Sequence, residues 1–501
     1  MNDEKQAKSI QISKKAMLVS TCLVALILLG SVALTLILKP GTIETAEDGS
    51  IQLLSGENNM TVWKYLLSPV LVLTPLYENF ATVWSIVLLC IVIGAVFSAL
   101  DASGVLVYMV ETLARKFGKN KYKLLFLLSL LMMFLGTTLG IAEEVVPLVP
   151  LAVMLFYALG WDAPLAVMAC DLAACAGFTV GVINPFNTGL AQSLSSEISM
   201  YSGILYRIAL FIVFYGALWL YLRSYAKKLD KNPRFSCTYE EDRERKKSFN
   251  FNPEALREDP GKNRALKWFA AVILVCLALA LSFIAAGTAF SKAAEKGGPM
   301  AETYESLSSI FSGYILYMLI LGYTVAGIGA CIRSGLKGKA LLKNLKDGVL
   351  TLLPAAAMIL LASAIGFIFG ESGVSDTIVY YAATAMGNSS GFVCILLLMV
   401  FLFILEIFIP SASGKAFLIM PLAYRLCTVL GIHHQLAVLA FLFADGFANS
   451  MLPSNSGLLI TLGLTTMSYP KWIKAAGKLF LLFFALAVGA LAVGYFLLYR
   501  G

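Results

Sequence analysis

Two adjacent carboxylates and one lysine lie in segments of this sequence that are otherwise apolar. Glu143 and Glu144 follow a glycine-containing turn at residues 136–140, and Lys415 follows the small polar run 410–414. An ionised side chain inside a membrane is costly, so it usually faces a cavity and has a partner. Neighbouring carboxylates also repel each other, which raises the pKa of one of them and suits proton exchange. The alternative is that one glutamate caps a helix or lies at the membrane interface.

Polar residues also accompany two predicted breaks in apolar helices, where freed carbonyls and side-chain oxygens could coordinate a substrate or a cation. These residues are Asn184, Pro185, Asn187 and Thr188 at the first break, and Ser454, Asn455 and Ser456 at the second. In the alternative interpretation, they only satisfy the hydrogen bonds of the broken helix ends.

The turn before Lys415 adds small hydroxyl residues, and a charged residue precedes the second break. The candidates here are Ser411, Ser413, Gly414 and Lys415, together with Asp445 and Asn449. Lys415 could hold a substrate carboxylate or snorkel to the interface, and Asp445 could hold an ion or an amine. The run SASGKA is not a phosphate-binding loop, because Ile409 and Ala416 stand where that motif needs Gly and Ser or Thr. Asp171 and Glu406 are weaker candidates, since either could be paired structurally.

These residues recur in two copies of one pattern. Pro150-Leu151-Ala152 and Pro421-Leu422-Ala423 lie 271 positions apart, as do Leu159-Gly160 and Leu430-Gly431. PFNTG at 185–189 matches PSNSG at 453–457 at an offset of 268, and Ser-Gly-Val recurs at 103–105 and 372–374. A nearly constant offset over several patches predicts a duplicated structural unit.

The composition predicts a polytopic membrane protein. The 501 residues are 59% hydrophobic and 14% charged, with a mean hydropathy of +0.81, and several apolar runs are long enough to cross a bilayer. The net charge of +8 therefore indicates basic loops rather than nucleic-acid binding. Nine cysteines without ligand spacing and only two histidines argue against a metal site and against disulfides. We expect no cofactor and no metal, and the coupling ion, H⁺ or Na⁺, stays open.

Loop charges set the expected topology and the division of the chain. The basic loop after helix 82–102 and the basic loop before helix 349–369 both belong inside, so these repeat partners run in opposite directions. The prediction is an all-α polytopic membrane protein with two inverted-topology repeats, each with a re-entrant hairpin and an interrupted transmembrane helix. The N-terminus is expected in the cytoplasm and the C-terminus outside. The expected units are 1–62 (a transmembrane helix and an extracytoplasmic loop), 63–222 (repeat 1), 223–264 (a cytoplasmic linker) and 265–501 (repeat 2 with its preceding helices).

The paired motifs resemble one known family. SASGKAFLIMPLA with LGIHHQLAVLAFLFADGFANSMLPSNSG, and AEEVVPLVPL with GFTVGVINPFNTG, are similar to the YfcC family, which is related to C4-dicarboxylate and arginine/ornithine carriers. The resemblance implies an ion-transporter-superfamily fold in the bacterial inner membrane. Lys415 stands where the family usually has glutamine, and Ala142 replaces the second glycine of a Gly-x-Gly-Glu-Glu pattern. Both departures bear on substrate identity.

We therefore expect a secondary active transporter that moves amino acids, basic ones included, by exchange or ion coupling. Glu143, Glu144 and Asp445 would face the amine, and Lys415 with Ser411, Ser413 and the breaks would face the carboxylate. The alternative substrate is a C4-dicarboxylate or another organic anion, with Lys415 as its charge partner. The expected partners are the small-molecule substrate and the lipid bilayer, with no nucleic acid, and a homodimer is compatible with the sequence. No His-based metal motif or Ser/Lys dyad supports an intramembrane enzyme, and saturable counterflow would distinguish a carrier from a channel.

Overall fold

A computed structural model describes most of the chain. The described residues are 14–45, 51–74, 80–140, 143–195, 197–198, 202–248, 259–295, 300, 303–304, 306–307, 315–387, 389–410, 412–465 and 467–499. Nearly all of them lie in helices, as expected where hydrocarbon leaves the backbone no water to bond. Among the described residues, six helices are long and apolar enough to cross a membrane, or seven if one bent pair forms a single span.

The first repeat runs from α3 to α10. Its helices are α3 (Phe80–Ala102), α4 (Val105–Phe117), α5 (Lys121–Leu139), η2 (Glu143–Leu148), α6 (Val149–Ala158), α7 (Ala163–Val167), η3 (Met168–Leu172), α8 (Ala173–Val180), η4 (Pro185–Gly189), α9 (Leu190–Ser193) and α10 (Ile204–Lys231), with the short turn η1 (Gly118–Asn120) before α5.

The second repeat reproduces this order. Its helices are α15 (Gly338–Ser372), α16 (Val374–Gly387), α17 (Gly391–Leu405), α18 (Ala412–Val429), α19 (His434–Met451), α20 (Ser456–Gly463), α21 (Tyr469–Val493) and η6 (Gly494–Leu498). Glycines at matching positions end matching elements in the left-handed conformation. Gly104 and Gly373 have φ of 69° and 67°, and Gly160 and Gly431 have φ of 85° and 64°. Because a residue with a Cβ rarely adopts such angles, these glycines fix the bends and turns of both repeats.

Each repeat contains a re-entrant hairpin whose two ends return to the same end of the molecule. In the first, the Tyr122 ring at the start of α5 lies 5.7 Å from the Trp161 ring, which follows α6. In the second, a Cβ on Gly391 at the start of α17 would lie 3.3 Å from Ile432 Cγ1, which follows α18. The chain therefore enters and leaves on one side in both hairpins.

The two repeats have opposite orientations. Gly94 of α3 packs against Gly348 near the start of α15, and Gly104 at the end of α3 faces Lys262 at the start of α12 (Pro260–Glu295). The far end of α15 instead meets the chain after α1 (Lys14–Ile37), where Gly41 N donates to Gly373 O at 3.2 Å. Matching helices α3 and α15 are therefore antiparallel, and the duplication is inverted.

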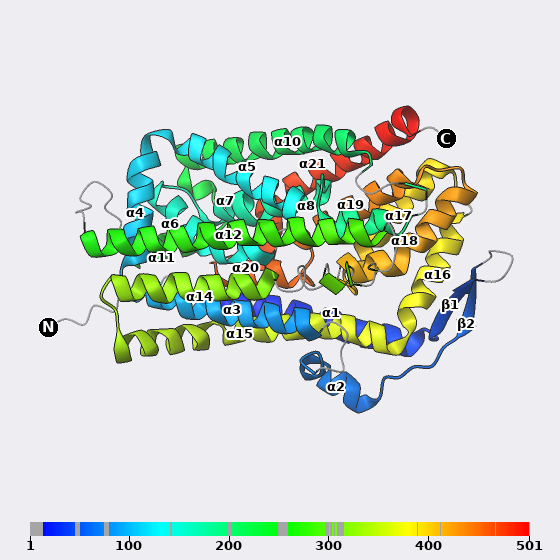
Figure 1. Ribbon diagram of the computed structural model, residues 1–501, viewed down its shortest axis with the longest axis horizontal. Helices are drawn as coiled ribbons and strands as arrows, with labels where there is room; N and C mark the ends of the chain where they lie inside the picture. Colours follow the sequence, from blue (N-terminus) through cyan, green and yellow to red (C-terminus); the bar gives the residue numbers. More distant parts are fainter. Residues whose placement is uncertain are drawn as a thin grey trace.

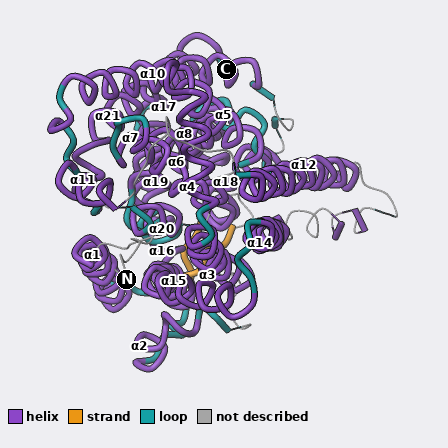
Figure 2. Tube along the Cα trace, turned by 90° about the vertical axis from the view of Figure 1, so that its left-hand side faces the viewer, coloured by secondary structure: helices purple, strands orange, loops and turns teal. Residues whose placement is uncertain are grey.

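The helices form two groups, which Figures 1 and 2 both show. The hairpins and interrupted helices lie with α10 and α21 in one group, and α1, α3, α14 (Ile315–Arg333) and α15 lie in the other. Helix α20 joins the groups by packing against α15 and α1. The core is buried where α5, α8, α17 and α19 pack together.

The two ends of the long axis differ in charge. One end, here called the basic end, carries the α4–α5 turn, the α14–α15 turn and α11 (Tyr239–Ser248), and α4 stands across it at the left of Figure 1. Its cations include Arg115, Lys116, Lys119, Lys121, Arg333, Lys337 and Lys339. The opposite, acidic end carries Glu57, Glu197, Glu371 and Asp376.

Two segments differ from what the sequence indicates. The loop expected after the first helix contains an antiparallel hairpin, β1 (Gly41–Thr45) with β2 (Ile51–Ser55). It is followed by the short helix α2 (Val62–Leu71), which exposes Val62, Trp63, Leu66, Leu67 and Val70.

The expected linker 223–264 is largely helical where it is described. Helix α10 continues to Lys231, and η5 (Pro233–Phe235) and α11 follow. Asp242 of α11 accepts hydrogen bonds from Tyr157 Oη (2.6 Å), Ala163 N (3.1 Å) and Thr238 Oγ1 (2.7 Å). Helix α11 reaches both repeats, since Arg245 Nη2 donates to Leu464 O at 3.4 Å.

Candidate functional site

A buried ion cluster lies where the second hairpin meets the second interrupted helix. Lys415 Nζ, in the first turn of α18, donates to Asp445 Oδ1 of α19 at 2.8 Å and also pairs with Glu406, which caps α17. The side chains of Lys415 and Asp445 are 1% exposed, and that of Glu406 is fully buried.

The cluster lies deep in the membrane region. Helix α17 begins at Gly391 near the acidic end, so its fifteen residues carry the chain about 22 Å inwards before Glu406. Asp445 lies eleven residues after His434, about 16 Å along α19 from the same end. Because a hydrocarbon core is about 30 Å thick, both estimates place the cluster well inside it.

Charge is not balanced within the cluster when all three groups are ionised, because two carboxylates share one ammonium. Asp445 Oδ2 is buried and has no hydrogen-bond partner among the described residues. A buried ionised oxygen without a partner is expensive, so this arrangement favours the arrival of a further positive charge.

The first helix break is organised by its own polar side chains. Gly181 ends α8 with φ of 50°, and the Thr188 hydroxyl donates to Gly181 O at 2.5 Å. Asn187 Nδ2 donates to Phe178 O at 2.9 Å, and Asn184 Nδ2 donates to Gly136 O of α5 at 3.4 Å. These three side chains are fully buried. Asn187 and Thr188 satisfy carbonyls that the break exposes at the end of α8, and Asn184 links the break to α5.

The second break uses the same residue types. Asn455 Oδ1 accepts from Leu458 N at 2.9 Å, which caps α20, and its Nδ2 donates to Asn449 Oδ1 at 2.7 Å. Ser454 Oγ donates to Glu406 O at 3.2 Å and so links the break to the ion cluster. Ser456 is half-buried in the first turn of α20.

Each hairpin packs against the broken helix of the other repeat. The turn η2, which contains Glu143 and Glu144, contacts α20, while α18 contacts η4 and α9. Asp171 Oδ1 accepts from Thr461 Oγ1 of α20 at 3.4 Å across the same boundary. The hairpins and helix breaks of the two repeats therefore meet at the repeat interface, which is where inverted-repeat transporters place their site.

Several predicted residues are described only in part. The side chains of Glu143, Glu144, Pro185 and Ser413, and all of Ser411, lie outside the described part of the chain, and Gly414 is described only as part of α18. Lys415 and Asp445 contact each other, whereas the sequence predicts that they bind opposite ends of a substrate.

Glu406, a weaker candidate from the sequence, belongs to the cluster. It is a lone carboxylate in the apolar run GFVCILLLMVFLFILEIF, six residues before the hairpin turn reaches Ala412. An isolated acid inside such a run was the available signal, because it must find a partner when it is buried.

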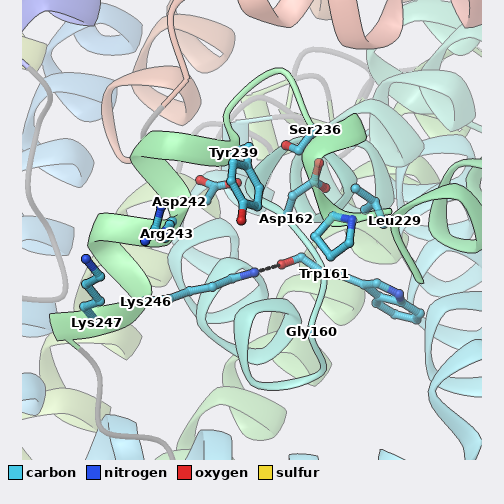
Figure 3. A pocket seen from close by; sticks show the side chains of 11 residues that line it. Gly160, Trp161, Asp162, Leu229, Ser236, Tyr239, Asp242, Arg243, Lys246 and Lys247 are labelled. Carbon is cyan, nitrogen blue, oxygen red and sulfur yellow. Dashed lines mark hydrogen bonds between the residues drawn. The ribbon is translucent and has the colours of Figure 1, made fainter. Parts of the chain in front are cut away.

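A cavity of about 410 Å³ lies away from this cluster, at the basic end, between α11 and the start of α7. Figure 3 shows Lys246 reaching across it to Trp161 O at 2.6 Å, with Asp162 and Asp242 nearby. Desolvation by burial, followed by the nearby Asp242 charge, raises the pKa of Asp162 to about 6.

Comparison with known sequences decides the family. The sequence pattern of the family DcuC, described as C4-dicarboxylate anaerobic carrier, matches residues 16–496. The chain belongs to this family. The match to the DcuC family covers both repeats and the linker. It confirms the resemblance to carriers of the YfcC type that the two motif pairs indicate.

Two curated relatives extend the comparison. The chain is 27% identical over 388 residues to an uncharacterised protein of Haemophilus influenzae, covering 76% of this chain and 70% of that protein. It is 24% identical over 430 residues to an Escherichia coli K12 protein named "Putative basic amino acid antiporter YfcC", covering 83% of this chain and 79% of that one. The Alcanivorax borkumensis YdaH transporter structure aligns with 95% of this chain and 98% of its own at 17% identity, with a TM-score of 0.44. This DcuC-family protein is thus a polytopic transporter of a cell membrane.

Proposed function

We propose that this transporter moves basic amino acids across the bacterial inner membrane by alternating access, through exchange or ion coupling. The observation that carries the proposal is the buried Glu406–Lys415–Asp445 cluster, in which carboxylates outnumber the cation. The printed name of the Escherichia coli relative points to the same substrate class.

The charges of the cluster favour a cationic substrate. Lys415 is already paired with two carboxylates of its own chain, so an entering dicarboxylate would meet repulsion from Glu406 and Asp445. An amine or guanidinium would instead neutralise the excess negative charge. Helix N-termini of α18 and α20 lie at the same interface, and such termini favour the α-carboxylate that every amino acid carries.

An organic anion, such as a C4-dicarboxylate, is the second candidate, because the description of the matched family names that substrate. In this case Lys415 would be the charge partner. It would have to exchange Glu406 or Asp445 for the substrate carboxylate during binding.

The orientation in the membrane belongs to the same proposal. The basic end, with its turns at 115–121 and 333–339, would face the cytoplasm by the positive-inside rule. The ring of Tyr499, the last described residue, lies 5.0 Å from that of His433 at the acidic end, which supports a C-terminus outside the cytoplasm.

Binding to purified variants tests the substrate class. Glu406→Gln should weaken L-arginine binding about thirty- to several-thousand-fold, since losing one partner of a desolvated pair costs roughly 2–5 kcal/mol. The matched control is Glu371→Gln, because Glu371 forms a half-exposed ion pair with Lys64 at the acidic end. Unchanged arginine affinity in Glu406→Gln, together with succinate binding that Lys415→Gln abolishes, would favour the organic-anion candidate.

A further inference from the structure

We infer that the Glu406–Lys415–Asp445 cluster is a proton-binding site, so that H⁺ rather than Na⁺ is the coupling ion of this transporter. A proton leaves the cluster when a cationic amino acid enters and returns when the substrate departs. This inference rests on the proposed function for the identity of the substrate, but the proton site itself can be tested without any substrate.

Counting charges leads to the proton. With all three groups ionised, the cluster carries one uncompensated negative charge in a region from which water is excluded. Two carboxylates around one site disfavour simultaneous ionisation, and a buried ionisable group generally neutralises rather than remain uncompensated. Deprotonating Lys415 would leave two bare carboxylates, so the neutralising proton belongs on a carboxyl group.

The same geometry argues against sodium. The ammonium of Lys415 already occupies the position between the two carboxylates, where a metal ion would have to bind. Hard cations gather several oxygen ligands, yet the amide oxygens of Asn449 and Asn455 beside the cluster accept hydrogen bonds from Asn455 Nδ2 and Leu458 N.

Several of the elements that pack against the cluster carry no formal charge. Helices α8, α9 and α20 and the turn η4, which contact α18 or α19, contain no Asp, Glu, Lys, Arg or His. The remaining titratable or charged groups on the cluster's own helices and on those packed against them are Cys175 (α8), Asp376, Tyr380 and Tyr381 (α16), Cys394 (α17), Tyr424, Arg425 and Cys427 (α18), His434 (α19), and Tyr469, Lys471, Lys474 and Lys478 (α21), with Asp171 and Arg207 next to α8.

Four of these charged groups have hydrogen-bond or ion-pair partners outside the cluster. Asp376 accepts from Ile43 N at the acidic end, and Lys471 pairs with Glu241 at the basic end. Asp171 accepts from Thr461, and Arg207 donates to Ser202 O and Val182 O. The excess charge of the cluster is therefore not cancelled by these neighbours.

The proton balance is simple. In the substrate-free state one carboxyl, shared between Asp445 and Glu406 as a coupled pair, holds one proton. When the site opens and a cationic amino acid binds, that proton passes to water and the substrate cation takes over its charge. The total charge of the cluster is the same in both states, so one proton is released for each cation bound.

Infrared spectroscopy of the full-length protein in detergent tests the proton site directly. At neutral pH we expect the carbonyl stretch of a protonated carboxylic acid. This band should disappear in Glu406→Gln, because Lys415 then balances the one remaining carboxylate, Asp445. Asp171→Asn is the matched control, since Asp171 is also a buried carboxylate of an interrupted helix, and the band should persist in it. L-arginine added to the wild-type protein should remove the band without any variant being needed.

Binding measured against pH gives the second test. L-arginine affinity should fall as the pH is lowered, by at most about tenfold per pH unit, because one proton competes with one cation. Sodium chloride and potassium chloride should give equal affinities at equal ionic strength.

The outcomes separate this inference from the proposed function. Absence of the acid band at every accessible pH, or a specific requirement for Na⁺, would overturn the proton site even if arginine binds. A band that Glu406→Gln removes, together with no binding of arginine, lysine or ornithine at any pH, would support the proton site and overturn the proposed substrate.

Discussion

Gly446 of α19 lies directly against Thr179 of α8, where the interrupted helices of the two repeats cross. A Cβ at position 446 would lie 2.4 Å from Thr179 N and 2.3 Å from Thr179 Cα. Because these are backbone atoms of a buried helix, they cannot move aside like the end of a flexible side chain. The close approach of the two halves of the transporter therefore requires that Gly446, the residue after Asp445, has no side chain.

Gly446→Ala should separate the two interrupted helices. We expect a loss of roughly 1–3 kcal/mol in stability, as for other overpacked interiors, together with loss of transport. Gly477→Ala on α21 is the control, because a Cβ there would meet nothing within 4 Å. Thermal unfolding in detergent should show destabilisation of the first variant only, and equal stability of both would contradict the close crossing.

Opposite membrane sides are predicted for the two charged ends. Lys119 at the basic end and Glu57 at the acidic end are both exposed. In intact bacteria, and in a background without the exposed native Cys22, an impermeant thiol reagent should label Glu57→Cys, whereas Lys119→Cys should react only after lysis. The reverse labelling pattern would invert the proposed orientation.

Asp242→Asn should loosen α11 from the repeats. Asp242 accepts hydrogen bonds from Tyr157, Ala163 and Thr238, and an amide directs its NH₂ group at one or more of these donors. We expect a cost of roughly 1–3 kcal/mol and faster hydrogen exchange in α11. The exposed Glu244→Gln on the same helix should leave exchange unchanged, and protection of α11 in both variants would rule out this role of Asp242.

Asp162 makes stability depend on pH in a predictable direction. Its folded-state pKa of about 6 exceeds its ordinary value of 3.8, so the folded state holds the proton more tightly and loses stability as the pH rises from about 4 through about 6. Between pH 5 and pH 7 this loss should be roughly 1 kcal/mol.

Asp162→Asn is the control for this pH dependence, because it removes the titrating carboxyl. Its amide oxygen can still cap α7 by accepting the hydrogen bond from Leu165 N, as Asp162 Oδ1 does. The pH dependence of the thermal midpoint should become shallower in the variant over this range. Trp161 fluorescence, next to the substituted residue, is a suitable signal. Parallel pH profiles of the two proteins would contradict a raised pKa at Asp162.

Much of the fold follows from local sequence. The glycines at 104 and 373, and at 160 and 431, could be paired by offset because each repeat needs a left-handed residue at the same bend. Asn187 and Asn455 could be placed at helix breaks because Gly181, Pro185 and Pro453 interrupt apolar helices there.

The partners within the site could not be predicted in the same way. Glu406, Lys415 and Asp445 belong to three helices, and only the packing of α17, α18 and α19 brings them together. Helix α11 has a charged sequence with no apolar periodicity. It is held by hydrogen bonds that Asp242 accepts and Arg245 donates, with partners far away in the chain. Such long-range polar contacts leave no local pattern.

Counterflow in proteoliposomes tests the central claim, basic amino-acid transport through the Glu406–Lys415–Asp445 cluster, most directly. Vesicles preloaded with unlabelled L-arginine should accumulate labelled L-arginine, excess succinate should not compete, and Glu406→Gln should abolish the accumulation while Glu371→Gln retains it. Counterflow of labelled succinate that arginine does not inhibit, and that Lys415→Gln abolishes, would contradict the account.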